Sequence, residues 1–220
     1  MRKLLMRPKP PFTNEERANF VVFLLSLEAR RPRLVDLVKN EGAAFYQEGF
    51  DSDAEIASLL KSTGSSETVS AAFERLSGAP VVDHALLLLQ QISLNPTLVR
   101  QIEGYHWGTF KLDDAHGTFV LSDRPLVRIN ATNDRQNLWA LPLSPKVAFF
   151  ASSTPEIQAN IKKRSQKQVR NLLNSDSAMQ SDRYVFSVDR ESLGWLERRM
   201  THPNRKAGPE MLTSLTRNSN

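Results

Sequence analysis

The sequence lacks cysteine entirely, with none among its 220 residues. Disulfide bonds and metal sites built on thiolates are therefore excluded. Because disulfides are rare in reducing compartments, we expect a cytoplasmic location. Long apolar runs are also missing, since none approaches the ~20 residues that a membrane-spanning helix needs. The sequence therefore predicts no membrane segment.

Glycine-rich motifs are missing too. The nine glycines are scattered along the chain, whereas a phosphate-binding loop or a dinucleotide fingerprint needs them closely spaced, so that the backbone can approach a phosphate. The two-histidine helix motif of zinc proteases does not occur either. The cofactor therefore stays unknown from the sequence, and whether the protein is an enzyme stays open at this point.

Positive charge is in excess but unevenly placed. The net charge is +5, and residues 104–220 hold 17 basic against 11 acidic residues, whereas residues 1–103 hold 12 against 13. A polyanionic partner would therefore contact the second half of the chain. A basic surface that is merely solvated accounts for the same excess, because charge alone specifies no ligand.

The two halves also differ in their apolar pattern. Residues 13–103 carry helical spacing that starts at a capping box, in which Thr13 and Glu16 exchange hydrogen bonds with each other's backbone. From Gly104 on, short alternating runs between turn residues predict an antiparallel sheet. Thr154 and Pro155 form a typical helix start, which predicts a basic helix to about residue 173 and then a loop with residual helix over 174–182.

These patterns predict an α+β fold, with an N-terminal helical layer packed on a small, mainly antiparallel sheet and one long basic helix. The expected division is an extended arm at 1–12, a helical part at 13–103, a sheet-plus-helix part at 104–200 and a mobile tail at 201–220. Because the sheet is too small to cover both of its faces, we expect 13–200 to form one cooperative domain.

Three short stretches are distinctive enough to indicate a family. Two of them place a proline-bearing corner inside an apolar run, namely Phe119-Val120-Leu121-Ser122-Asp123-Arg124-Pro125-Leu126 and Leu141-Pro142-Leu143-Ser144-Pro145-Lys146. The third is Asn174 followed by Asp182-Arg183-Tyr184-Val185-Phe186-Ser187. In this order they resemble a widespread, uncharacterised bacterial family, domain of unknown function 4238. The family's helical segment that ends in an arginine and a proline is similar to residues 27–33, so the resemblance covers most of 13–187.

Members of that family usually begin with a histidine-containing segment ahead of the first helix. The sequence before Thr13 contains no histidine. We therefore expect either a short variant of the family or a chain without its usual beginning. An active site built on those histidines would be missing with them.

Ser122 and Asp123 are the candidate catalytic residues, because a serine and a carboxylate on an exposed turn can position a nucleophile or bind a metal. The alternative is structural, since both side chains commonly bond to nearby backbone amides and Pro125 fixes a dihedral angle of a tight corner. A catalytic triad would need His106 or His116 to reach Ser122. The same histidines with Asp123 are conceivable as a metal site, if separate strands converge.

A candidate nucleic-acid-binding surface lies on the basic helix. Its cations lie mostly along one side of the helix, from which they can follow a phosphate backbone. They are Lys162, Lys163, Arg164, Lys167 and Arg170. Tyr105 and Trp107 occupy alternate positions of an expected strand, where they can stack on a base or pack in the core.

The sequence leaves the function unknown and three hypotheses open. The first is a nucleic-acid-linked role, such as one in bacterial defence or toxicity. The second is a hydrolase-like or metal-dependent enzyme that uses Ser122 and Asp123. The third is a structural or protein-interaction domain, for which the sequence indicates no particular protein partner.

Overall fold

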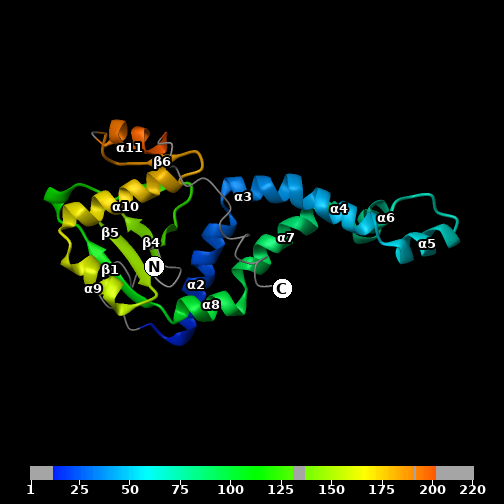
Figure 1. Ribbon diagram of the computed structural model, residues 1–220, viewed down its shortest axis with the longest axis horizontal. Helices are drawn as coiled ribbons and strands as arrows, with labels where there is room; N and C mark the ends of the chain where they lie inside the picture. Colours follow the sequence, from blue (N-terminus) through cyan, green and yellow to red (C-terminus); the bar gives the residue numbers. More distant parts are fainter. Residues whose placement is uncertain (1–11, 131–136, 191, 202–220) are drawn as a thin grey trace. The chain divides into compact units, whose positions relative to one another are not determined.

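The structure is a computed structural model that describes residues 12–130, 137–190 and 192–201. Most of the expected arm and tail lie outside these ranges. The chain divides into two compact units, of which unit 1 combines residues up to Glu28 with those from Asn95 onward, and unit 2 is Ala29–Leu94 (Figure 1). The helical part expected at 13–103 thus contributes to both units. Within the described ranges, no helix is long and apolar enough to cross a membrane.

Unit 1 is built on a four-stranded antiparallel sheet with the strand order β1-β5-β4-β3. These strands are β1 (His106–Lys111), β3 (Val127–Asn130), β4 (Asn137–Ser144) and β5 (Val147–Ser152). A tight turn at Pro145 joins β4 to β5, as the proline-bearing corner in the sequence predicts. Two further strands, β2 (Leu121–Ser122) and β6 (Val185–Phe186), pair separately. The predicted α+β fold with a small antiparallel sheet is confirmed.

Helices cover both faces of the four-stranded sheet. Neighbouring residues of β5 point to opposite sides of the sheet and therefore contact different helices. Phe149 faces α2 (Asn14–Ala29), where its ring lies 5.1 Å from that of Phe20. Phe150 faces the other way, into a hydrophobic cluster with Ile161 of α9 (Pro155–Lys163) and Leu173 of α10 (Gln166–Gln180). Figure 1 shows α9 and α10 lying along the sheet. Two shorter helices, α8 (Pro96–Glu103) and α11 (Leu193–Met200), complete unit 1.

The expected single basic helix is divided into α9 and α10. Its break is a capping box, in which the Ser165 hydroxyl accepts from the Gln168 N–H at 3.3 Å and the Gln168 carboxamide accepts from the Ser165 N–H at 2.9 Å. This reciprocal pair starts a new helix at Gln166, so the expectation of one continuous helix is corrected. The loop expected over 174–182 is corrected as well, because α10 continues to Gln180.

The described residues of unit 2 form helices and connecting turns, without a strand. It contains α3 (Pro32–Leu37), α4 (Ala43–Asp51), α5 (Ala54–Ser62), α6 (Val69–Ser77) and α7 (Val81–Ser93). A single π-helical turn, Val38–Gly42, joins α3 to α4. The Asp51 carboxylate at the end of α4 accepts hydrogen bonds from the N–H and the hydroxyl of Ser70, at 2.9 and 3.0 Å, which fastens α4 to α6.

Candidate functional site

The Ser122–Asp123 corner lies at the end of β2 and is tied to the segment that precedes β6. The Ser122 side chain is buried, and its hydroxyl donates to the carbonyl of Arg124 at 2.7 Å. The Asp123 carboxylate accepts three backbone N–H bonds from the consecutive residues 182–184, at 2.8, 2.6 and 3.0 Å. The Asp123 N–H donates in turn to the carbonyl of Tyr184 at 3.1 Å. Two of the three family-like stretches therefore meet at this corner.

These contacts are those of a structural corner. A carboxylate that accepts three N–H bonds has much of its lone-pair capacity occupied. Within the described residues, neither His106 nor His116 is hydrogen-bonded to Ser122, and no group of three or more histidine, aspartate or glutamate residues is arranged to hold a metal ion. A catalytic role for Ser122 and Asp123 stays a prediction, and the geometry supports the structural alternative.

A buried ion pair lies behind the corner. The guanidinium of Arg124 donates to the carboxylate of Glu28 at 3.1 Å, and the two side chains are 3% and 0% exposed. Glu28 belongs to the last turn of α2, so this pair links the first helix of unit 1 to the corner. In this buried setting each charge stabilises the other.

Four of the five basic residues of the predicted nucleic-acid-binding surface gather where α9 meets α10. We call Lys162, Lys163, Arg164 and Lys167 the α9–α10 junction. All four side chains are exposed, and none of them forms a hydrogen bond or ion pair with another described residue. Two of them lie in the last turn of α9, where positive charge also stabilises the helix end.

Arg170, the fifth basic residue, is held in place instead of projecting freely. It is half-buried, its Nη1 donates to the carbonyl of His116 at 3.0 Å, and its Nε and Nη2 donate to Oδ1 of Asn171 at 3.1 and 2.8 Å. Gly117 makes room for it, because a Cβ at that position would collide with the guanidinium. Gly117 also has a φ of +71°, which side-chain-bearing residues rarely adopt.

The hydrogen bonds of Arg170 belong to a series along one side of α10. Gln166, Arg170 and Asn174 are spaced four residues apart and therefore lie above one another on the helix. Gln166 exchanges two bonds of 2.7 Å with Asp113. Asn174 accepts from the N–H of Val120 at 3.0 Å and donates to the carbonyl of residue 118 at 2.9 Å. This series fastens the segment between β1 and β2 to α10.

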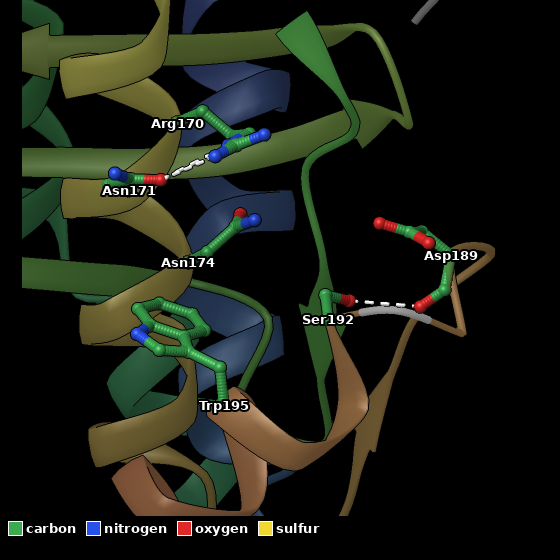
Figure 2. A pocket seen from close by; sticks show the side chains of 6 residues that line it. All are labelled: Arg170, Asn171, Asn174, Asp189, Ser192 and Trp195. Atoms are coloured by element: carbon green, nitrogen blue, oxygen red, sulfur yellow. Dashed lines mark hydrogen bonds between the residues drawn. The ribbon is translucent and has the colours of Figure 1, made fainter.

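A pocket of about 350 Å³ opens between α10, α11 and the segment that joins β6 to α11. Figure 2 shows the polar side chains of α10 on one side and the Trp195 ring of α11 beside Asn174. The Ser192 hydroxyl donates to the carbonyl of Asp189 at 2.9 Å, which holds the joining segment in place. The residues lining the pocket are Arg170, Asn171, Asn174, Asp189, Ser192 and Trp195.

The two aromatic residues considered for base stacking pack against other residues of unit 1. Tyr105 is buried. The Trp107 ring carries the Arg17 guanidinium 3.9 Å from its centroid, and its indole N–H donates to the carbonyl of Ile102 at 3.2 Å. Both aromatics are therefore used in packing unit 1.

The corner, the junction and α10 all lie within a match to a known protein family. The family model described as "Protein of unknown function (DUF4238)" matches residues 1–191. The chain belongs to the DUF4238 family. A search of curated proteins and a search of solved structures each gave no match. The family resemblance in the sequence is thereby confirmed, and the function stays unknown.

The DUF4238 match ends at residue 191, so it includes the α10 side of the pocket and Asp189 but stops before Ser192 and Trp195. The sequence pointed to Arg170 as a phosphate contact and to Asn174 as a family position. It gave no reason to group either with Asp189, Ser192 or Trp195. The one available signal was the four-residue spacing of Gln166, Arg170 and Asn174, which indicates a polar helix side used for tertiary contacts.

Proposed function

We propose that this DUF4238 chain binds a nucleic acid through the α9–α10 junction. The observation that carries the proposal is the exposure of Lys162, Lys163, Arg164 and Lys167 without any partner among the described residues. Between residues 155 and 173 the only acidic residue is Glu156, at the far end of α9. A phosphate backbone at the junction would therefore meet positive charges, with no carboxylate beside them to compete for the cations.

The way the two helices meet supports the same partner. The C-terminal turn of α9 presents lysines next to the first turn of α10, whose backbone N–H groups carry the positive end of the helix dipole. Cations on two helices at an angle can contact successive phosphates of a strand, and such contacts give affinity without sequence preference. A cytoplasmic role in bacterial defence or toxicity is the biological setting that we propose for this binding.

The test is fluorescence-anisotropy titration of short single-stranded and double-stranded oligonucleotides, in buffer of low and moderate salt. The variant to compare replaces all four junction cations, as Lys162→Gln, Lys163→Gln, Arg164→Gln and Lys167→Gln. We expect the wild-type chain to bind at low salt and to lose affinity steeply as salt is added. The variant is expected to bind at least about tenfold more weakly, because each phosphate contact contributes to affinity.

A matched control removes the same number of positive charges elsewhere. Lys39, Lys61, Arg100 and Lys111 are all exposed, and their replacement by glutamine gives the same net charge as the junction variant. We expect this control to bind nearly as well as the wild-type chain. Equal losses in the two variants would assign the binding to net charge and overturn the junction as the site, as would the absence of any binding at low salt.

A further inference from the structure

Three side chains of α10 offer hydrogen-bond donors at the pocket between α10 and α11. Arg170 has five N–H groups, three of which take part in its bonds to His116 and Asn171. The Oδ1 atom of Asn171 receives two of those bonds, so its amide group contributes two further N–H donors with no partner among the described residues. Asn174 uses one of its two amide N–H bonds for residue 118. A ligand that fits this lining must bring several acceptors.

The guanidinium of Arg170 is set in position before any ligand arrives. Its bonds to His116 and Asn171 fix the plane of the group, and Gly117 leaves it the room to lie there. A side chain that is already ordered loses little conformational entropy when it binds, which raises its affinity for an oxyanion. Arginine is also the side chain whose fork of donors best matches phosphate oxygens.

The rest of the lining supplies what a nucleoside needs. Trp195 is partly buried and presents its ring to the pocket (Figure 2), where a base can stack on it. The pocket volume of about 350 Å³ lies within the range of small-ligand sites.

We propose that this pocket binds a nucleoside monophosphate, with the phosphate on Arg170 and Asn171 and the base on Trp195. The assignment rests on the proposed nucleic-acid function, which supplies the source of the nucleotide. Arg170 lies one turn after Lys167 of the junction on the same helix. A strand that follows the junction therefore reaches the pocket with its phosphorylated terminal nucleotide. A free mononucleotide offers the same chemistry, and the experiment separates the two sources.

The first measurement is isothermal titration calorimetry of the full chain with adenosine 5′-monophosphate and its guanosine, cytidine and uridine counterparts. Adenosine and inorganic phosphate are the comparison ligands. We expect at least one monophosphate to bind, phosphate alone to bind more weakly, and adenosine to give no detectable binding. Failure of all monophosphates, or phosphate binding as tight as the best monophosphate, overturns the assignment.

The decisive variant is Asn171→Asp. Its Oδ atoms still accept from Arg170, so the guanidinium keeps its place, but two donors are lost and a negative charge is added beside the phosphate. We expect monophosphate binding to weaken by about tenfold or more. Gln168→Glu makes the same charge change on α10 outside the pocket and is compatible with the capping box, so it should leave binding nearly unchanged. Retained binding in Asn171→Asp, or equal loss in both variants, contradicts the proposal.

A second variant tests the base. Trp195→Leu removes the stacking ring but keeps an apolar side chain, and it should reduce monophosphate affinity to that of inorganic phosphate. If monophosphates bind this variant as tightly as the wild-type chain, the assignment of the base to Trp195 is overturned.

Oligonucleotides with and without a phosphate at either end then identify the source. Tighter binding of phosphorylated ends in the wild-type chain, lost in Asn171→Asp, assigns the pocket to strand ends. No gain from the phosphate, with mononucleotide binding intact, assigns it to free nucleotides. The junction variant should lose oligonucleotide binding but keep mononucleotide binding, so failure of the junction proposal is distinguishable from failure of the pocket proposal.

Discussion

The guanidinium of Arg124 and the carboxylate of Glu28 lie 3.1 Å apart, with side-chain exposures of 3% and 0%. In Glu28→Gln the buried Arg124 guanidinium loses this carboxylate partner. We predict that Glu28→Gln lowers the free energy of unfolding by about 3–5 kcal/mol, the usual consequence of breaking a buried pair. Urea denaturation followed by circular dichroism measures this change.

The control for that prediction lies on the same helix. Glu15 is exposed in the first turn of α2, and Glu15→Gln should cost less than about 1 kcal/mol, since only its interaction with the helix dipole is lost. If Glu28→Gln proves as mild as Glu15→Gln, the pair contributes little and the link between α2 and the corner rests on apolar packing.

A second prediction concerns Asp123. The variant Asp123→Ala leaves three backbone N–H groups without their acceptor, so we expect the free energy of unfolding to fall by about 3 kcal/mol or more. Asp123→Asn keeps one acceptor oxygen and should cost less. Thermal unfolding of both variants measures this order. A catalytic residue would behave differently, with cellular activity lost at an unchanged melting temperature, and that outcome would restore the enzyme hypothesis.

The edge strand β3 gives a third prediction. The carboxamide of Gln180 accepts from the N–H of Arg128 at 3.1 Å and donates to its carbonyl at 2.8 Å, as a neighbouring strand would do. Gln180→Ala should cost about 1–3 kcal/mol, speed hydrogen exchange of the Arg128 amide and promote aggregation through the exposed edge. Gln101→Ala, an exposed change on α8, is the control. Unchanged exchange at Arg128 would show that water replaces Gln180 adequately.

The salt dependence of nucleic-acid binding gives a fourth prediction. The slope of log affinity against log salt concentration counts the phosphates that are neutralised, at about 0.7 per contact for single strands and about 0.9 for duplexes. Removing the four junction cations should therefore lower the slope by about 3 units. Titrations at a series of salt concentrations measure the slope. The matched control variant should keep the wild-type slope, and an unchanged slope in the junction variant would place the contacts elsewhere.

A fifth prediction addresses the expected cooperative domain at 13–200. All three tryptophans, Trp107, Trp139 and Trp195, belong to unit 1, so their fluorescence reports on that unit alone. Far-ultraviolet circular dichroism reports on the helices of both units. We predict that the two signals change together during urea unfolding, as they must in a two-state transition. An early loss of dichroism at constant fluorescence would show that unit 2 unfolds by itself.

The sequence predicted those elements whose signals lie in residues that are neighbours in the chain. The capping box at the start of α2 forms as expected, with the Thr13 N–H donating to Glu16 at 3.0 Å and the Glu16 N–H donating to Thr13 at 3.1 Å. The apolar runs on either side of Ser144-Pro145 likewise indicated β4 and β5. In these places each residue's own preference agrees with the final fold.

The second half of α10 shows where local preference fails. Asn174 and Ser177 favour loops, because their side chains compete for backbone hydrogen bonds, whereas Gln180 has no such preference. In the structure all three are buried, and Asn174 and Gln180 bond to the backbone of other elements. Tertiary hydrogen bonds thus stabilise a helix that the composition disfavours. A sequence cannot display such partners, since they lie more than 50 residues away in the chain.

The pocket was hidden for a related reason. Arg170 reads as one more cation of a basic helix, and nothing local shows that His116 and Asn171 hold its guanidinium. Trp195 lies on a different helix, and only the path of the chain through β6 brings it beside Asn174. Convergence of distant segments creates this site, so residue spacing alone does not reveal it.

The packing of unit 2 depends on how many residues the π-helical turn Val38–Gly42 contains, rather than on which residues they are. Such a turn accommodates one residue more than an α-helical turn, and each residue of an α-helix advances the chain by about 100° around its axis. Deleting one residue there would merge α3 and α4 into one regular helix and rotate the side chains of α4 by about that angle. The side of α4 that now packs against α7 would then face elsewhere. The extra residue in this turn therefore sets the rotation of α4 about its axis, and with it the side of α4 that packs against α7.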